Sequence, residues 1–488
     1  MTILVLDEGT SSTRALLFDE AGRIIDSEQQ PVRCGYPRPG WVEQDADAIW
    51  EATRDVAATV IERAGGAAAI AAIGITNQRE TVVAWDKDTG EPLAPAIVWQ
   101  DRRTAQACAA LRDGGHETFV HERSGLLLDP YFSASKMRWL LDHEGAVAQA
   151  AARGTLAFGT IDCWLRFKLT GRFETDASNA SRTALMALET SRWDDDLCTL
   201  FGVPGSALPG IIDMAGDLGS CGLFGDPILV AASVGDQQAA TLGQACIKQG
   251  MAKATFGTGL FALASTGATP PKSEHRLLAT LLYQRDDIRL YALEGSVFVA
   301  GSLVQWLRDM AGLVGSAQET ETLARSVEDN GGVTIIPAFT GLGAPHWRAD
   351  ITGSIHGLTF GVTRAHLVRA ALEAVVHSAV DLAEAFAADG APWRELQVDG
   401  GMIANDWLAQ DLADISGVTV ARPENVESTA RGAAILAAVG AGIHGDLETA
   451  IGAMLPRYES FEPAIERARR EERRAQWQER LQAALRSA

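Results

Sequence analysis

Short apolar runs separated by turn-forming residues organise the start of the chain. Ile3–Leu6 and Ala15–Phe18 are predicted strands, and Asp7–Arg14 between them is rich in residues that form turns. Asp45–Arg63 then has apolar residues at helical spacing. Ile70–Ile75 is an uninterrupted apolar run, as expected of a strand that is buried on both faces of a parallel sheet.

The same order of strand, Gly/Thr turn and returning strand occurs again in the second half. Met251–Phe256 leads into Gly257-Thr258-Gly259, and Leu260–Leu263 returns. This weak duplication predicts two related α/β domains that face each other, residues 1–245 and residues 246–488. The length agrees, because 488 residues exceed the ~250–300 at which a single hydrophobic core stops growing.

The charge balance argues against one class of function. The chain has 42 basic and 63 acidic residues, a net charge of −21, whereas nucleic-acid binders usually present a basic surface. Anionic substrates must then be held by local devices such as helix N-termini, metal ions and single arginines.

The apolar runs, the N-terminal residues and the cysteines indicate the compartment in which the protein works. No apolar run reaches the ~20 residues of a membrane helix, and the N-terminus lacks the basic region and cleavage site of a signal peptide. The six cysteines form no C-x-x-C pair. These features predict a cytoplasmic protein with reduced thiols and no integral membrane segment.

Three glycine-containing turns together predict a site for ATP and Mg²⁺. In Gly9–Ser12, small residues let backbone N–H groups approach phosphate oxygens, with Asp7 placed for Mg²⁺ and Arg14 for a phosphate. Thr255–Gly259 has the same chemistry. Val398–Asn405 joins a strand to a helix across two glycines, which leaves room for a flat ring such as adenine. Any one of these turns alone is more often structural.

A charged pair and a single carboxylate each follow the end of a predicted apolar strand. Arg79 and Glu80 follow the strand Ile70–Ile75, at the carboxyl edge where open sheets form their sites, although such a pair is by default a surface salt bridge. Asp236 follows another apolar run. An unpaired carboxylate is costly to bury there, which favours a metal or substrate role.

These motifs resemble the FGGY carbohydrate kinase family of the actin-like ATPase superfamily, over nearly the whole chain. The resemblance implies two actin-like (ribonuclease H-like) domains, each a central mixed sheet flanked by helices, with the active site in the cleft between them. Seven stretches point to the members that phosphorylate glycerol: Tyr36–Glu43, Gly74–Thr81, Ala96–Gln100, Asp129–Ser133, Asn179–Thr183, Gly235–Ala240 and Pro337–Pro345.

The resemblance also implies roles for individual residues. Asp236 would be the general base that activates glycerol, and Thr258 would contact the transferring phosphoryl group, giving sn-glycerol 3-phosphate and ADP. The implied acceptor site is Arg79, Glu80, Trp99, Tyr131, Asp236, Gln237 and Phe261. The implied nucleotide site is Thr10, Ser11, Ser12, Arg14, Thr258, Gly301, Gln305, Gly401 and Asn405. The implied Mg²⁺ ligands are Asp7 and Asp236, and the implied assembly is a homo-oligomer, a dimer or tetramer.

Two alternatives and several departures stay open. The alternatives are a kinase for another small polyol or ketose of the same family, and a non-catalytic actin-like nucleotide switch. Glu8 replaces the family's usual Gln and, with Asp101, is expected to make the site more acidic unless it points away. His346 stands where Tyr is common and is expected to reshape the rim of the acceptor pocket. Ala464–Ser487 is predicted to be a solvated helix.

Overall fold

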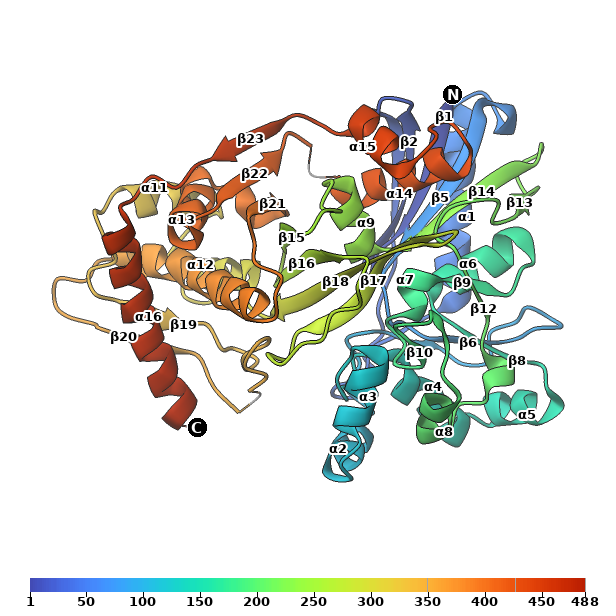
Figure 1. The fold of residues 1–488 in the computed structure, drawn as a ribbon, viewed down its shortest axis with the longest axis horizontal. Helices are drawn as coiled ribbons and strands as arrows, with labels where there is room; N and C mark the ends of the chain where they lie inside the picture. The colour runs from blue at the N-terminus through green and yellow to red at the C-terminus, as the bar shows by residue number, and fades with distance from the viewer. Residues whose placement is uncertain (349, 426, 488) are drawn as a thin grey trace.

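A computed structural model describes residues 1–348, 350–425 and 427–487, so Ala349, Val426 and Ala488 lie outside the described residues. It has two large mixed sheets flanked by helices, which form two domains side by side (Figure 1). In spatial order, the first sheet is β13 (Ser220–Cys221), β14 (Ile228–Gly235), β5 (Ile70–Asn77), β1 (Thr2–Glu8), β2 (Ser12–Asp19) and β3 (Ile24–Pro31). The second is β17 (Leu278–Arg285), β18 (Ile288–Val297), β16 (Leu260–Gly267), β15 (Met251–Phe256), β21 (Glu395–Asp399), β22 (Thr419–Pro423) and β23 (Tyr458–Phe461).

Both sheets are mixed, which confirms the predicted fold class. β5 is parallel to β1 and β14, whereas β1, β2 and β3 pair antiparallel. β15 is parallel to β21 and antiparallel to β16. Small two-stranded sheets pair β4 (Glu43–Gln44) with β7 (Ala96–Ile97), β6 (Val83–Asp86) with β8 (Leu156–Gly159), β9 (Glu174–Asp176) with β12 (Gly210–Ile212), β10 (Met186–Ala187) with β11 (Arg192–Trp193), and β19 (Thr334–Ile336) with β20 (Ser354–His356).

Helices cover the sheets on their outer faces and fill the space between them. The first half of the chain contributes α1 (Ala46–Arg63), α2 (Ala105–Asp113), α3 (Glu117–Ser124), α4 (Ser133–His143), α5 (Gly145–Arg153), α6 (Ile161–Thr170), α7 (Ala177–Ala180), α8 (Asp195–Phe201) and α9 (Asp236–Gly243). The second contributes α10 (Gly301–Asp309), α11 (Glu319–Arg325), α12 (Arg364–Ala388), α13 (Asp406–Ser416), α14 (Ser428–Gly440), α15 (Leu447–Met454) and α16 (Arg467–Ser487).

Side chains of β1 alternate between two apolar layers. Leu4 and Leu6 pack with α1, whereas Ile3 and Val5 pack in the layer between the two domains. Because successive side chains of a strand point to opposite faces, this alternation carries on to the strand end. The two acids that follow, Asp7 and Glu8, therefore point in opposite directions.

Two helices, α9 and α14, pack against each other between the sheets (Figure 1). Their contact is close: a Cβ on Gly432 would lie 1.8 Å from the carbonyl oxygen of Ala239, so only glycine fits there. Although α14 belongs to the second half of the chain, it covers β14, β5 and β1 of the first sheet. A division into residues 1–245 and 246–488 therefore stays a prediction.

The C-terminal helix α16 is docked, so the prediction of a solvated helix is wrong for one of its faces. Trp477 and Leu481 are only 3% and 1% exposed. Arg473 Nη1 lies 2.6 Å from Asp411 Oδ1, and Trp477 Nε1 donates to Asp381 Oδ2 over 2.8 Å. The charged composition of the helix hid this, because Arg473 and Arg474 pair with acids of α13 and α12 rather than with water.

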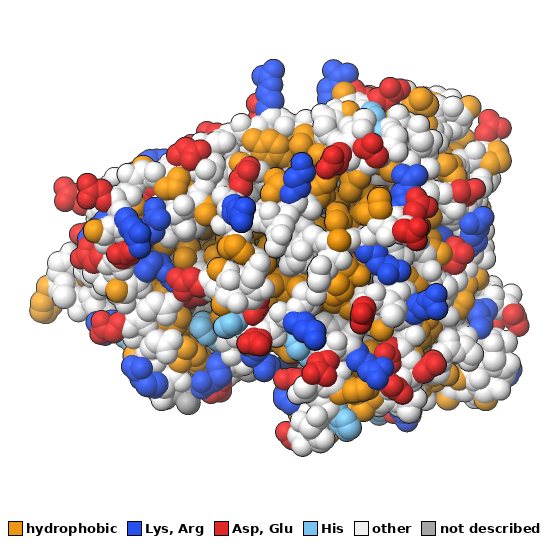
Figure 2. All heavy atoms as spheres, viewed as in Figure 1, with side chains coloured by type: hydrophobic (Ala, Val, Ile, Leu, Met, Phe, Trp, Pro, Cys, Tyr) orange, Lys and Arg blue, Asp and Glu red, His pale blue; other side chains and the backbone are white. Residues whose placement is uncertain are grey.

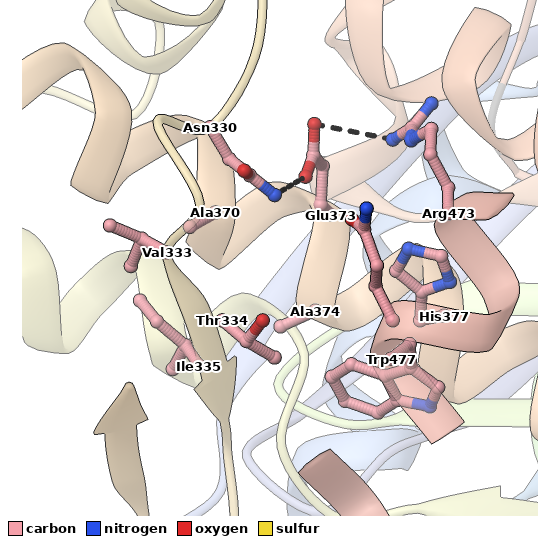
Figure 3. A pocket seen from close by; sticks show the side chains of 11 residues that line it. Asn330, Val333, Thr334, Ile335, Ala370, Glu373, Ala374, His377, Arg473 and Trp477 are labelled. Atoms are coloured by element: carbon pink, nitrogen blue, oxygen red, sulfur yellow. Dashed lines mark hydrogen bonds and ion pairs between the residues drawn. The ribbon is translucent and has the colours of Figure 1, made fainter. Parts of the chain in front are cut away.

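A small cavity of about 20 Å³ lies beneath α16 (Figure 3). Glu373 projects between Asn330 and Arg473, accepting from Asn330 Nδ2 over 2.7 Å and pairing with Arg473 Nη2 at 3.2 Å. This volume suits about one water molecule, so the cavity is a gap in the packing rather than a substrate site.

The surface charges, the helix lengths and the cysteines bear on the predicted class of protein. Acidic and basic side chains are interspersed on the face shown in Figure 2, without a continuous basic stripe. No helix within the described ranges is long and apolar enough to cross a membrane. All six cysteines are free thiols, and five of them are buried.

Candidate active site

Two rows of side chains on the second sheet face the first domain. Ala252, Ala254 and Phe256 of β15 point into the core of the second domain, so Lys253 and Thr255 point the other way. The strand register extends each position across the sheet. One row reads Asp399, Thr255, Phe261 and Ser296, and the next reads Gln397, Lys253, Leu263 and Glu294.

Asp236 begins α9, directly after β14 of the first sheet. Its side chain is 34% exposed, and Oδ1 lies 3.2 Å from Arg79 Nε and accepts from the backbone N–H of Gln237 over 2.6 Å. Burial raises the pKa of the Asp236 carboxyl to about 6, although Arg79 opposes this. A carboxylate with this pKa can accept a proton at neutral pH better than an ordinary aspartate.

Arg79 is buried and held from the other domain. Its Nη1 donates to Oε2 of Glu294 in β18 over 2.7 Å, and its Nη2 donates to Oε1 of the same carboxylate over 3.0 Å. Nη1 also donates to Gln238 Oε1 over 3.2 Å. Within the described part of the chain, hydrogen bonds engage Nη1 twice and Nη2 once, whereas Nε forms only an ion pair with Asp236, so the second N–H of Nη2 has no acceptor. That donor is available for one hydroxyl group.

Glu80 is buried and has a backbone conformation that is rare outside glycine, with φ of 61°. Its carbonyl oxygen accepts from Ser133 Oγ over 3.1 Å and from Lys136 Nζ over 3.3 Å, which stabilises this conformation. Its Oε1 accepts from Arg182 Nε over 2.6 Å. No described group donates to Oε2, which is left to accept from a ligand.

Sequence reasoning did not assign two residues that organise this site, Arg182 and Glu294. Arg182 is fully buried and touches both Glu80 and Glu294, the latter at 3.2 Å. Burial disfavours ionisation of Glu294, but Arg182 and Arg79 outweigh it and lower its pKa to about 2. The available signal was an acid inside the apolar strand Ile288–Val297, since a carboxylate there needs a cationic partner.

Aromatic side chains connect the predicted acceptor residues to the first phosphate turn. Trp99 Nε1 donates to Thr10 Oγ1 over 2.9 Å, and the Trp99 ring meets Tyr131 edge-on with centroids 5.7 Å apart. The guanidinium of Arg182 lies 5.6 Å from the centroid of the Tyr131 ring. Phe261 belongs to the sheet row next to Lys253, which donates to Gln237. The structure therefore brings all the predicted acceptor residues to one region.

In the first predicted phosphate turn, Arg14 is already engaged. It pairs with Asp7 and, over 2.7 Å, with Glu427 next to the start of α14. Ser11 is exposed, whereas the Ser12 hydroxyl accepts from Gln29 Nε2 of β3 over 2.9 Å. Arg14 thus holds Asp7 in place, and a phosphate would have to share this guanidinium with two carboxylates.

The second turn and the predicted adenosine segment lie against each other. The carbonyl oxygen of Thr258 accepts from the backbone N–H groups of Ala300 and Ser302, and a Cβ on Gly301 would lie 2.5 Å from Gly257 O. A Cβ on Gly400, where φ is 97°, would lie 2.5 Å from Phe256 O. The side chain of Thr258 and the whole of Gly401 stay exposed.

The remaining two predicted nucleotide residues differ in their surroundings. Asn405 caps α13, accepting from Leu408 N over 3.0 Å, and its Nδ2 donates to Thr320 Oγ1 over 3.2 Å. Gln305 is exposed on α10. Asn405 is thus built into the fold, whereas Gln305 is free to turn toward a ligand.

Glu8 points away from the site, which is one of the two possibilities left open for it, and Asp101 is paired with an arginine. Glu8 points to the α1 side of the sheet, where it is fully buried and accepts from Thr53 Oγ1 over 3.2 Å. Burial raises its pKa to about 8, so it is largely neutral. Asp101 is neutralised by Arg103 at 2.8 Å and accepts from the backbone N–H of Val42 over 2.6 Å.

The third departure, His346, is partly buried in the loop that follows Pro345. Its Nε2 is buried and has no hydrogen-bond partner among the residues that the structure describes, and burial lowers the pKa of the ring. The ring is therefore neutral at physiological pH. Its effect on the pocket rim stays a prediction.

Asp7 and Asp236, the predicted Mg²⁺ ligands, are carboxylates, which is a ligand type that Mg²⁺ takes in proteins. Within the described ranges, no three His, Cys, Asp or Glu side chains gather as a self-sufficient metal site. Mg²⁺ does not need one, because it commonly binds one or two carboxylates together with waters and substrate phosphates. Burial raises the pKa of Asp7 while Arg14 opposes this, so a further cation would stabilise its charged form.

Known families and structures match the chain over nearly its whole length. Residues 2–243 and 252–441 match the N-terminal and C-terminal domains of the FGGY family of carbohydrate kinases. A glycerol kinase of Rhodospirillum centenum is 50% identical over 482 residues, 98% of this chain and 97% of that protein. One from Rhodospirillum rubrum is 48% identical and covers 97% of each chain.

The match extends to solved structures. The crystal structure of Plasmodium falciparum glycerol kinase with ADP has a TM-score of 0.94 and 33% identity, covering 99% of this chain and 98% of that one. A xylulose kinase from Rhodospirillum rubrum has a TM-score of 0.88 and 26% identity, covering 100% and 99%.

Proposed function

This chain belongs to the FGGY family of carbohydrate kinases, and from that premise we propose that it transfers the γ-phosphoryl group of ATP to glycerol, forming sn-glycerol 3-phosphate and ADP. The observation that carries the proposal is the contact between Asp236 and Arg79, at 3.2 Å. This contact places a carboxylate that is suited to act as a base beside a guanidinium group that has an N–H available for a ligand. The glycerol kinases at about half identity support glycerol as the acceptor.

The acceptor pocket that we propose fits a small polyol. Arg79 offers one N–H donor and Glu80 one free carboxylate oxygen, while Gln237 lies next to the base. Trp99, Tyr131 and Phe261 provide apolar surface for a short carbon chain. A site built on paired hydrogen bonds rejects compounds that lack a hydroxyl group, because its own buried groups would stay unpaired.

In the proposed reaction, Asp236 accepts the proton of a terminal hydroxyl group. The oxygen attacks the γ-phosphorus in line, a new O–P bond forms, and the bond to ADP breaks. Such transfer needs mainly positioning and charge neutralisation from the protein. Thr258 and the N–H groups near Thr10 would contact the phosphates, and Asp7 and Asp236 would hold Mg²⁺, which neutralises phosphate charge when bound.

The experiment is ADP release with glycerol, erythritol, xylulose, gluconate or no acceptor. We expect clear preference for glycerol and little turnover without acceptor. Preference for a four- or five-carbon substrate would favour another kinase of the family, and acceptor-independent turnover would favour a nucleotide switch. Asp236→Asn should lose most of kcat while still binding ATP, and near-normal turnover would refute the assignment of the base.

We also propose a cytoplasmic homo-oligomer. Leu358 and Phe360 are fully or largely exposed on the segment between β20 and α12, and residues 351–363 contain no Asp, Glu, Lys or Arg. A charge-free apolar surface on a chain with a net charge of −21 supports contact between copies, since it avoids their mutual repulsion. Light scattering of the wild type and of Phe360→Ser tests this; a monomeric wild type would contradict it.

A further inference from the structure

The proposed reaction leaves one buried cation of the site without a role. Lys253 of β15 is fully buried and faces the first domain. Its Nζ donates to Gln237 Oε1 over 2.6 Å and to Thr255 Oγ1 over 2.9 Å. A buried ammonium group that is bonded to two neutral side chains is costly, which points to a specific purpose.

The two contacts of Lys253 connect both sides of the proposed site. Gln237 is in the first turn of α9, directly after Asp236, on the acceptor side. Thr255 is near the end of β15, which leads into the turn Gly257-Thr258-Gly259 on the phosphate side. The surrounding charges include Asp399, Asp236, Glu294 and Arg79. Lys253 thus ties the acceptor side to the phosphate side through one side chain.

We propose that Lys253 is a positioning residue that sets the orientation of the Gln237 amide, with its oxygen toward Lys253 and its NH₂ group toward the acceptor hydroxyl. An ammonium group has three donors and no acceptor, so it can bind only the amide oxygen. No described group accepts from Gln237 Nε2, so its hydrogens are available to a substrate. The inference rests on the proposed function, because it needs an acceptor hydroxyl at Gln237.

This orientation suits the chemistry at Asp236. The attacking hydroxyl must donate its proton to the carboxylate, and its oxygen gains negative charge as that proton leaves. An amide N–H directed at this oxygen stabilises the developing charge, whereas an amide oxygen in the same place would repel it and compete for the proton. Without Lys253 the amide is free to rotate between the two orientations.

The first test compares Lys253→Met, Lys253→Gln and Lys253→Arg in the full-length enzyme. We expect Met and Gln to lower kcat for glycerol roughly 10–100-fold, with KM for ATP within about twofold of the wild type. Arg, which also only donates, should restore most of kcat. A merely structural role would lower the melting temperature without this split, and wild-type kcat in a folded Met or Gln variant would overturn the inference.

The second test asks whether Lys253 acts through Gln237. Gln237→Leu alone and Gln237→Leu with Lys253→Met should show similar kcat, because the second change removes an orienting group that no longer has a target. Losses that multiply would overturn the inference. The acceptor panel with the wild type decides the proposed function independently, so a failure of one is distinguishable from a failure of the other.

Discussion

Replacing Glu8 with Gln should stabilise the protein, and increasingly so as pH rises. Glu8 is fully buried, and burial raises its pKa from 4.5 to about 8. Gln has nearly the same shape and no charge, and it is the residue that the family pattern has at this position. The carboxylate lies on the α1 side of the sheet, away from Asp7, so the change leaves the proposed metal site intact.

The pKa of Glu8 is higher in the folded protein than in the unfolded chain, and this difference sets the direction of the pH dependence. Below pH 4.5 Glu8 is protonated whether the chain is folded or unfolded, and it contributes no pH dependence. Between 4.5 and 8 the unfolded chain ionises while the folded protein keeps the proton, so folding loses stability as pH rises. At about 1.4 kcal/mol per pH unit, the loss reaches about 2 kcal/mol at pH 6 and roughly 4 kcal/mol near pH 8.

Thermal unfolding of the two proteins between pH 5 and pH 9 measures this. The melting temperature of Glu8→Gln should exceed that of the wild type by a margin that grows with pH, at roughly 2–4 °C per kcal/mol. Glu51→Gln, an exposed glutamate on α1, is the matched control and should show no growing margin. A difference that stays constant with pH, or that shrinks as pH rises, would refute the reasoning.

Four further outcomes follow from the site and the docked helix. The pKa of about 6 for Asp236 predicts that kcat/KM falls about tenfold per unit below pH ~6, as the base becomes protonated; a flat profile would contradict it. Glu294→Gln removes the carboxylate that two arginines share, so steady-state kinetics should show KM for glycerol raised about 10-fold or more with KM for ATP unchanged. Trp477→Ala should lower the free energy of unfolding by about 3–5 kcal/mol in denaturant titration while kcat is unchanged. Asp101→Asn breaks a buried pair with Arg103 and should lower the melting temperature by several degrees without changing kcat.

Much of the fold could be predicted, because strand and helix follow from the local spacing of apolar residues. β1, β2, α1 and β5 all lie where that spacing indicated, and the two Gly/Thr turns follow their strands as expected. The prediction was wrong for α16, whose arginines indicated solvent. Arg473 and Arg474 pair instead with acids of α13 and α12, which sequence spacing does not reveal.

In the candidate site, too, local sequence indicated some residues, whereas others became clear only from the packing. Arg79 and Asp236 stood out because each follows an apolar strand, where an unpaired charge is costly to bury. Glu294 did not stand out enough, since its importance depends on Arg79, 215 residues away in the chain. The direction of Glu8 stayed open, because it depends on the register of β1 against its neighbours.

By itself, the sequence determined the α/β architecture, the three glycine turns and the family, since these depend on local periodicity and on residue types that few other structures require. The tertiary structure decided which charges meet. Glu294 and Lys253 reach Arg79 and Gln237 across the boundary between two domains. Buried charges must find partners wherever the packing brings them, and that choice is set by the arrangement of the sheets rather than by neighbours in the chain.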